Sequence, residues 1–433
     1  MACHPAQFVV MKKWLLRIGL GFLLVLVLLY SFLMVRSKIP ATVNDGELQL
    51  VRANNPKDSN AFDVLQEAGG HIWWPENQSE SIYDLARNTN WDVNLASTVL
   101  ASNREALAGW DAAIQQPDFQ VPEVFDPSAS LTYLSNWKKL ALLAEVRGNF
   151  LFHNGQDKEA FDQFLKIVQL GRRMQNANGV LIDYLVGAAV NNIGLSQMQH
   201  WAGKSHLNAN QLKDYIRQLE LKPDVESAAY ANTIKAEYQF QTMMVEMTCT
   251  GKMTNTLGGG YFPRISPWWP VFNLTETKAL FAHGALQLVK ASSRHYSEVN
   301  VAELEARPNL VSIYLSGNGV GQVLYYMAIP AVATSLVQKS RCDVQLQATR
   351  TILALRAYQL THGQLPANLN ALVPDFLDAV PMDDFDSQPL RYSAEKKIVY
   401  SVGKNLKDDG GDDRTSSADS AQRHLDLVYR FDF

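Results

Sequence analysis

The hydrophobic pattern begins with one long apolar run. Residues 14–35 read WLLRIGLGFLLVLVLLYSFLMV and contain one charged residue, Arg17, near their start. About 20 apolar residues suffice for a helix to cross the hydrocarbon layer of a membrane. A cleaved signal peptide has a shorter apolar core and a small-residue cleavage site, whereas this run continues into Arg36, Ser37 and Lys38. The pattern predicts an uncleaved transmembrane anchor, and a cleaved signal peptide is the alternative.

Basic residues around this run set its expected orientation. Residues 1–13 form a short tail that ends in Lys12 and Lys13, although basic residues also follow the run. A short basic tail before an anchor usually stays in the cytoplasm. We therefore expect a single-pass protein of the inner, cytoplasmic membrane. Residues 36–59 would be a tether, and the bulk of the chain would lie in the periplasm or outside the cell.

From about residue 60 to residue 200, apolar residues recur at helical spacing. In residues 131–152 they form one stripe, made of Leu131, Leu134, Trp137, Leu140, Ala141 and Ala144. In residues 157–174 they form another, made of Ala160, Phe164, Ile167, Val168 and Leu170. A spacing of three or four residues is typical of one helix face, and the sequence HNGQ separates the stripes. The two segments are predicted to form a helical hairpin.

The second half of this hairpin resembles a tetratricopeptide (TPR) unit. Gly155, Ala160 and Phe164 match the turn glycine and the small and large residues that interlock the two helices of that repeat. The first helix is too long for the repeat, and no second copy follows at the expected period. We expect a TPR-like hairpin within an irregular helical bundle.

Further helices are predicted along the middle of the chain. Residues 181–202 form a strongly apolar segment in which small residues allow a neighbour to pack closely, namely Gly187, Ala188, Ala189 and Gly194. Two more helices are separated near Pro223. Another helical stretch runs from about residue 320 to residue 360, and Pro330 is expected to kink or split it.

Residues 251–272 interrupt the helical pattern with three consecutive glycines, three prolines and many aromatic residues. Long irregular segments are often functional. The aromatic side chains could contact a ligand, a partner or the membrane surface, or they could cover the bundle as a packed lid. The sequence leaves both interpretations open.

Strand patterns are concentrated near the carboxyl terminus. After a short helix expected within residues 363–381, the segments LRYS, KIVYSVG and LDLVYRF alternate as strands. The predicted fold is therefore mainly α. It comprises a transmembrane helix, a helical domain over residues 60–340, and a small α+β unit with an antiparallel sheet over residues 341–433.

Three short motifs follow one another in this last unit. The first is carried by Tyr358, Gly363, Pro366, Leu369 and Leu372, the second by Pro381, Asp383, Phe385, Pro389 and Tyr392, and the third by Tyr400, Ser401 and Gly403. Together they resemble the globular domain of type II secretion major pseudopilins. That family has proline, glycine and aspartate where this chain has Asp384, Ser387 and Asn405. The resemblance covers about residues 345–433, and the family's usual helix with a glutamate directly before this domain is not matched.

An acidic, glycine-containing segment, NLKDDGGDD, follows the third motif. Calcium takes six to eight oxygen ligands, and a flexible acidic loop can supply them. The resemblance implies that the calcium loop of pseudopilins lies at this place. The candidate calcium ligands are Asn405, Asp408, Asp409, Asp412 and Asp413. The alternative is a solvated loop without a metal.

Composition narrows the functional classes. The chain of 433 residues carries 39 basic and 43 acidic residues, a formal net charge of -4, which gives no field that would gather nucleic acid. Three cysteines are too few for a disulfide scaffold or a four-thiolate zinc site. Cys249 and Cys342 could pair in an oxidising compartment or could be two buried thiols.

Linear catalytic motifs are missing. The sequence contains no H-E-x-x-H pair, G-x-S-x-G elbow, Walker loop or kinase signature. Catalytic groups can converge from distant positions, so an enzymatic role stays open. The favoured hypothesis is a membrane-anchored extracytoplasmic module that binds proteins or forms an envelope scaffold. The alternatives are an anchored hydrolase with a cleft near residues 251–272, and an accessory component of a secretion or pilus-like system.

Overall fold

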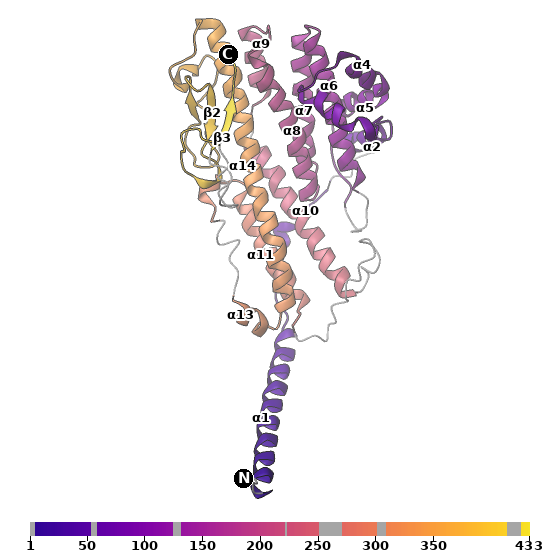
Figure 1. Cartoon of the computed structure of the whole chain (residues 1–433), viewed down its shortest axis with the longest axis vertical. Coiled ribbons are helices and arrows are strands. Elements are labelled where there is room, and N and C mark those ends of the chain that lie inside the picture. The colour runs from indigo at the N-terminus through magenta and orange to yellow at the C-terminus, as the bar shows by residue number, and fades with distance from the viewer. Residues whose placement is uncertain are drawn as a thin grey trace. The chain divides into compact units, whose positions relative to one another are not determined.

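The computed structural model describes most of the chain. The described ranges are residues 5–52, 59–123, 131–220, 223–250, 271–300, 309–413 and 426–433. They are mainly helical and carry one antiparallel sheet of three strands, which confirms the predicted fold class at this level (Figure 1). Most of the aromatic segment, residues 251–270, lies outside the described residues, as does the side chain of Cys249. Cys342 is a buried free thiol.

The chain falls into two compact units. Unit 1 comprises Met1–Leu48, Tyr238–Leu286 and Ala302–Ala331, and unit 2 comprises Gln49–Glu237, Gln287–Val301 and Val332–Phe433. Each unit is therefore assembled from segments that are far apart in the sequence. The predicted domain bounds at residues 36–59, 60–340 and 341–433 stay predictions.

Unit 1 contains the apolar helix α1 (Pro5–Ser37), together with α11 (Leu274–Ala291) up to Leu286 and the short α13 (Leu310–Leu315). Within α1, Leu16–Ser37 is long and apolar enough to cross a membrane, and none of its most apolar stretch of 18 residues is buried inside the protein. An apolar helix of this kind fits a membrane anchor or a signal sequence. Of the other described helices, α14 (Gly319–His362) is also long and apolar enough to cross a membrane, but nearly half of its most apolar stretch is buried inside the protein.

Most helices of unit 2 follow one another along the chain. They are α2 (Ala61–Gly70), α3 (Ser79–Arg87), α4 (Val93–Ser102), α5 (Arg104–Gln115), α6 (Thr132–His153), α7 (Asp157–Gln175), α8 (Leu181–Ala202) and α9 (Ala209–Gln218). The next helix, α10 (Pro223–Thr250), begins at the predicted proline and contributes to both units. The helix α14 runs through Pro330 without interruption, so the expected split at this proline is wrong.

The helices α6 and α7 form the predicted hairpin, and their apolar stripes are buried. Leu131 is the exception, because it precedes the first helical residue and its side chain is 39% exposed. The turn between the helices contains Gly155 at a φ of +74°, a left-handed conformation that favours glycine. Phe164 packs on Gly148, where an added Cβ would lie 2.2 Å from the ring. The large and small residues of the two helices thus interlock.

The helices α7 and α8 are in direct backbone contact. A Cβ added to Gly171 would lie 2.3 Å from the backbone nitrogen of Asn191, and one added to Gly194 would lie 2.6 Å from the carbonyl oxygen of Phe164. Gly187 faces the end of α7 in the same way. Backbone contact at this distance requires residues without a side chain, which confirms the prediction for both glycines of α8. Ala189, in contrast, is exposed.

Polar side chains from α6 and α8 hold the end of α3. Asn149 Nδ2 donates to the carbonyl oxygens of Leu85 and Ala86 at 3.1 and 2.7 Å. Gln197 Nε2 donates to the Ala86 carbonyl at 3.3 Å and to Glu145 Oε1 at 2.7 Å. The last carbonyl groups of a helix lack partners within it, so these bonds satisfy them inside the core. Burial raises the pKa of Glu145 to about 8, although the bond from Gln197 opposes this shift.

The C-terminal sheet consists of β1 (Arg391–Ser393), β2 (Ile398–Ser401) and β3 (Leu427–Arg430), in the order β1-β2-β3 with both pairs antiparallel. The three predicted strands are confirmed. The short helix expected within residues 363–381 is only a 3-10 turn, Leu369–Leu372.

Asp383 joins the segment before β1 to the end of β2. Its side chain is fully buried, and Oδ1 accepts hydrogen bonds from Ser401 Oγ at 2.8 Å and from the backbone nitrogen of Phe385 at 3.0 Å. Oδ2 accepts from the backbone nitrogen of Val402 at 3.0 Å and from Arg391 Nη1 at 3.1 Å. Burial raises the pKa of Asp383, and these hydrogen bonds oppose the shift. Four donors around one carboxylate fix this part of the chain.

We predict that Glu145→Gln flattens the pH dependence of stability. The folded protein keeps the Glu145 proton up to about pH 8, whereas the unfolded chain releases it near pH 4.5. The free energy of unfolding should therefore fall by up to about 1.4 kcal/mol per pH unit as the pH rises between these values. Urea unfolding across this range should show the variant as more stable than the parent near pH 8. Exposed Glu159→Gln is the control, and parallel profiles for parent and Glu145→Gln would contradict the prediction.

We predict that Asp383→Ala lowers the free energy of unfolding of the soluble part by roughly 3 kcal/mol, because buried donors and Arg391 lose a shared acceptor. The exposed Asp375→Ala, nearby in the chain, should change it by less than about 0.5 kcal/mol. Denaturant unfolding followed by tyrosine and tryptophan fluorescence measures both. Equal effects of the two substitutions would show that the Asp383 network does not stabilise the fold.

Candidate functional site

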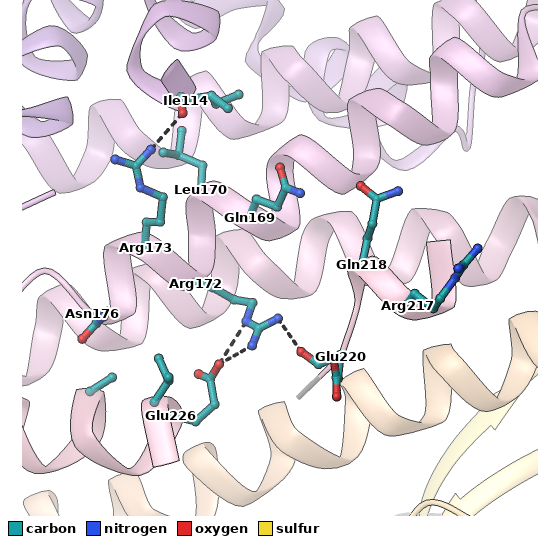
Figure 2. Close-up of a pocket in the computed structure, with 12 residues that line it drawn as sticks. Ile114, Gln169, Leu170, Arg172, Arg173, Asn176, Arg217, Gln218, Glu220 and Glu226 are labelled. Carbon is teal, nitrogen blue, oxygen red and sulfur yellow. Dashed lines mark hydrogen bonds and ion pairs between the residues drawn. The ribbon is translucent and has the colours of Figure 1, made fainter. Parts of the chain in front are cut away.

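A groove in unit 2 is lined by α7, α9, the end of α5 and the start of α10, and we call it the α7 groove (Figure 2). Its volume is about 560 Å³. Buried Leu170 and Ala229 lie at its base, and Val225 is 46% exposed at its side. Exposed carboxamide side chains surround this apolar surface, namely Gln169, Asn176 and Gln218. The groove thus combines an apolar base with polar edges.

Arg172 fixes the wall of the α7 groove. Its guanidinium donates from Nε at 3.1 Å, and also from Nη2, to Glu226 Oε1 at the start of α10. Nη1 donates to the backbone carbonyl of Glu220 at 3.2 Å (Figure 2). Two of these bonds are to a carboxylate, and charge-assisted bonds are the stronger kind. Arg172 therefore joins α7 to the chain on either side of the α9–α10 connection.

Arg173, the next residue, has a structural role at the end of α5. Nη1 donates to the carbonyl oxygens of Ala113 and Ile114 at 3.1 and 3.0 Å. Nη2 donates to those of Gln116 and Asp118 at 2.6 and 3.0 Å. Burial lowers the pKa of Arg173, and the charge of Asp118 opposes this shift. Because four carbonyl groups accept from its guanidinium, Arg173 holds the wall of the groove in place, and other lining residues would contact a ligand.

The carboxamides give the α7 groove its binding chemistry. Each carboxamide offers both a donor and an acceptor, which is also what a peptide backbone offers. Gln169 lies on α7, Asn176 follows the last residue of that helix about two turns further on, and Gln218 ends α9 opposite them. This arrangement suits an elongated polar ligand with apolar side chains.

A second cavity of about 370 Å³ lies between α14, the end of α9 and the segment 378–384, and we call it the 343–384 cavity. It is lined by Glu220, His295, Asp343, Gln347, Arg350, Asp378, Ala379, Val380, Pro381, Met382 and Asp384. The sequence analysis missed this cluster, because its members come from four separate parts of the chain and share no spacing.

An ion cluster closes one side of this cavity. Lys339 Nζ lies 2.9 Å from Asp343 Oδ2 and 3.4 Å from Asp384 Oδ2, and its side chain is only 7% exposed. His295 Nδ1 lies 3.2 Å from Asp384 Oδ1. Burial alone lowers the pKa of Lys339, but the two carboxylates outweigh it and raise the pKa. Burial raises the pKa of Asp343 to about 6 against the opposing charge of Lys339.

Asp384 also connects segments through its backbone. Its carbonyl oxygen accepts from the backbone nitrogen of Tyr296 at 2.9 Å, and the carbonyl of Phe385 accepts from that of Ser297 at the same distance. The rings of Tyr296 and Phe385 meet edge to face, 5.2 Å apart. Asp384 is also one of the residues that differ from the pseudopilin pattern, which has proline at this position. The aspartate side chain is what pairs with Lys339 and His295.

The predicted calcium ligands lie in the loop after β2, where they pair with one another, with backbone groups of the loop, and with Arg391 and Arg430. Asn405 Nδ2 donates to Asp409 Oδ2 at 2.8 Å. Asp408 Oδ1 accepts from the backbone nitrogen of Gly410 at 2.9 Å, and Asp413 Oδ2 lies 3.1 Å from Arg430 Nη2. Within the described ranges, no three His, Cys, Asp or Glu side chains are grouped so that they could hold a metal ion. Calcium at Asn405, Asp408, Asp409, Asp412 and Asp413 stays a prediction.

Asp426, which the sequence analysis did not single out, closes this acidic loop. Its carboxylate accepts from the backbone nitrogens of Asp409 and Gly411 at 3.3 and 2.7 Å, and its own backbone nitrogen donates to the Asp412 carbonyl at 3.0 Å. Burial raises the pKa of Asp426, and these two hydrogen bonds to its carboxylate oppose the shift. The only sequence signal was its place immediately before the last strand.

The hydrolase hypothesis placed its cleft near residues 251–272, of which residues 251–270 lie outside the described part of the chain. The 343–384 cavity does lie between helices and the C-terminal residues and contains several titratable side chains. Comparisons with family models, with curated protein sequences and with solved structures find no match for this chain.

Thermal unfolding with excess calcium and with a chelator tests the calcium prediction. If calcium binds, it stabilises the folded protein by mass action, so the melting temperature should rise with calcium concentration. Asp408→Ala combined with Asp412→Ala should abolish this rise. The exposed pair Asp375→Ala and Asp378→Ala, outside the loop, should leave it intact. A melting temperature that is the same with calcium and with chelator would contradict a calcium site.

Proposed function

We propose that this chain is a membrane-anchored extracytoplasmic binding protein, which holds segments of other proteins in the α7 groove. The observation that carries the proposal is the composition of that groove. Exposed Gln169, Asn176 and Gln218 surround an apolar base in about 560 Å³. Polar groups at these edges can pair with a peptide backbone while the base takes an apolar side chain.

Rigid walls favour this proposal. Binding costs less when the site is already in its bound conformation. Arg172 is held by Glu226 and by the Glu220 carbonyl, and Arg173 is held by four carbonyl groups. The walls of the groove are thus fixed by contacts that a ligand need not replace. The proposed ligand is a short extended polypeptide segment.

The TPR-like interpretation of α6 and α7 belongs to the same proposal. The interlocking of Phe164 with Gly148, together with the turn at Gly155, supports it. In this interpretation the hairpin is the rigid element that presents Gln169 and Asn176. The pseudopilin-like unit at the carboxyl end of the chain would be an accessory domain.

The membrane placement rests on α1. Most of the apolar side chains in residues 16–35 are exposed, and a bilayer is the environment that would cover them. The basic tail before it supports a cytoplasmic amino terminus and an extracytoplasmic bulk. We propose a single-pass protein of the inner membrane on this basis.

The 343–384 cavity keeps an anchored hydrolase as the second candidate. Asp343, with its pKa raised to about 6, could give up a proton near neutral pH, and Asp384 lies within hydrogen-bond distance of His295 and could orient it. A protein-binding role is favoured because Lys339 already neutralises both carboxylates. An accessory role in a secretion or pilus-like system rests on the resemblance alone.

Site-specific photo-crosslinking in native membranes tests the binding proposal. A benzophenone amino acid at Gln169 or Gln218 should form an adduct with one or a few polypeptides, identified by mass spectrometry. Glu159, exposed at the other end of α7, is the matched control position and should give none of these adducts. Val225→Lys, which places a charge beside the apolar base, should weaken capture about ten-fold, equivalent to about 1.4 kcal/mol.

Two results would contradict the proposal. One is the absence of any reproducible adduct at both groove positions. The other is the same set of adducts at Glu159 as at Gln169, which would indicate contact without use of the groove. Glu159→Lys serves as the matched charge control for Val225→Lys, because both positions are exposed.

A further inference from the structure

The short helix α13 exposes an apolar face that unit 1 does not cover. Leu310, Val311 and Tyr314 are 72%, 67% and 66% exposed, and Leu315 is 46% exposed. Ile313 alone of the large side chains points into the unit, with 9% exposure. Single exposed apolar residues are common, but four on six residues of helix form a patch that calls for a partner.

The turn after α13 lies against the end of α1. A Cβ added to Gly317 would lie 2.8 Å from the Arg36 side chain and 3.0 Å from the backbone nitrogen of Ser37. Gly317 has a φ of +76°, so the turn itself also favours glycine. Figure 1 shows α13 at the same end of α1. The apolar face of α13 therefore starts where the apolar helix ends.

Hydrogen bonds fix this neighbourhood, so the chain leaving α1 is held rather than free. Asn273 Nδ2 donates to the Ile39 carbonyl at 2.6 Å, and the backbone nitrogen of Ala41 donates to Thr275 Oγ1 at 3.1 Å. The backbone nitrogen of Asn273 in turn donates to Asn318 Oδ1, directly after Gly317, at 2.9 Å. One residue before α11 thus holds both the exit of α1 and the turn that follows α13.

These contacts set the level of α13 relative to a bilayer. The apolar run of α1 continues to Val35, which is 68% exposed, and the first charge after it is Arg36. Arginine at the end of a spanning helix lies at the head groups. Because Gly317 touches Arg36, α13 lies at the same level, where an exposed tyrosine and aliphatic side chains are stable.

We propose that α13 is an interfacial helix, which inserts Leu310, Val311, Tyr314 and Leu315 into the membrane surface beside α1. The proposal rests on the membrane anchoring of α1 proposed above. The bilayer is the chosen partner because the apolar face of α13 continues the apolar surface of α1 across a fixed contact. With this second attachment, unit 1 is held against the membrane at two points and cannot rotate about α1.

Photo-crosslinking of the full chain in phosphatidylcholine vesicles tests this inference. A benzophenone amino acid replaces Tyr314 in one variant and Met327 in another. Both side chains are exposed in the same unit, but Met327 lies about 12 Å along α14 from its start at Gly319. Lipid adducts detected by mass spectrometry should be roughly ten-fold more abundant at Tyr314 than at Met327.

Phe22, within α1, is the position that reports anchoring itself. Lipid adducts at Phe22 and Tyr314 but not at Met327 support the interfacial helix. Adducts at Phe22 alone overturn it while anchoring stands, and no lipid adduct at Phe22 overturns both. Protein adducts at Tyr314 would show that a second copy covers this face. Equal lipid adducts at Met327 would place α14 in the membrane, and either result overturns the proposal.

Discussion

Three glycines bring the backbones of α7 and α8 so close that a side chain at any of these positions would overlap the neighbouring helix. This contact fixes how α7 is turned about its own axis. With Gly171 against Asn191, the residues on the other side of α7 must face α9 and the start of α10. Gln169, Arg172 and Asn176 reach the groove for this reason. A larger residue at Gly171 would separate the helices and rotate the groove wall with them.

Two adjacent carboxylates organise the C-terminal part of unit 2 in different ways. Asp383 points inward and gathers backbone and side-chain donors around the end of β2, so it stabilises the small sheet. Asp384 instead faces Lys339 and His295, so it joins this sheet region to α14 and to the segment at residue 295. Buried charges are stable only when paired, and here the pairs cross between distant segments. The 343–384 cavity exists because these segments meet.

The acidic loop illustrates how a protein accommodates many like charges. Asp408 accepts from the backbone nitrogen of Gly410, and Asp408 and Asp413 lie near Arg391 and Arg430. The backbone nitrogens of Asp409 and Gly411 donate to Asp426. Repulsion among the carboxylates is reduced by these partners, and Asp426 contributes a further carboxylate from across the loop. Hydrogen bonds to Asp426 thus close the loop.

Sequence by itself determined the elements of this protein. The local pattern of hydrophobic and turn residues predicted α1, the α6–α7 hairpin, α8 and the three strands, because local spacing decides which elements form. The hydrophobic pattern failed within residues 363–381, where prolines leave only a 3-10 turn, and a split at Pro330, one of the two expected outcomes there, does not occur. The tertiary structure alone decided the sites. The α7 groove, the cluster of Lys339, Asp343, Asp384 and His295, and the closure of the acidic loop by Asp426 all join residues far apart in the chain. No local pattern encodes such meetings, because they follow from how packed helices and strands bring distant side chains together.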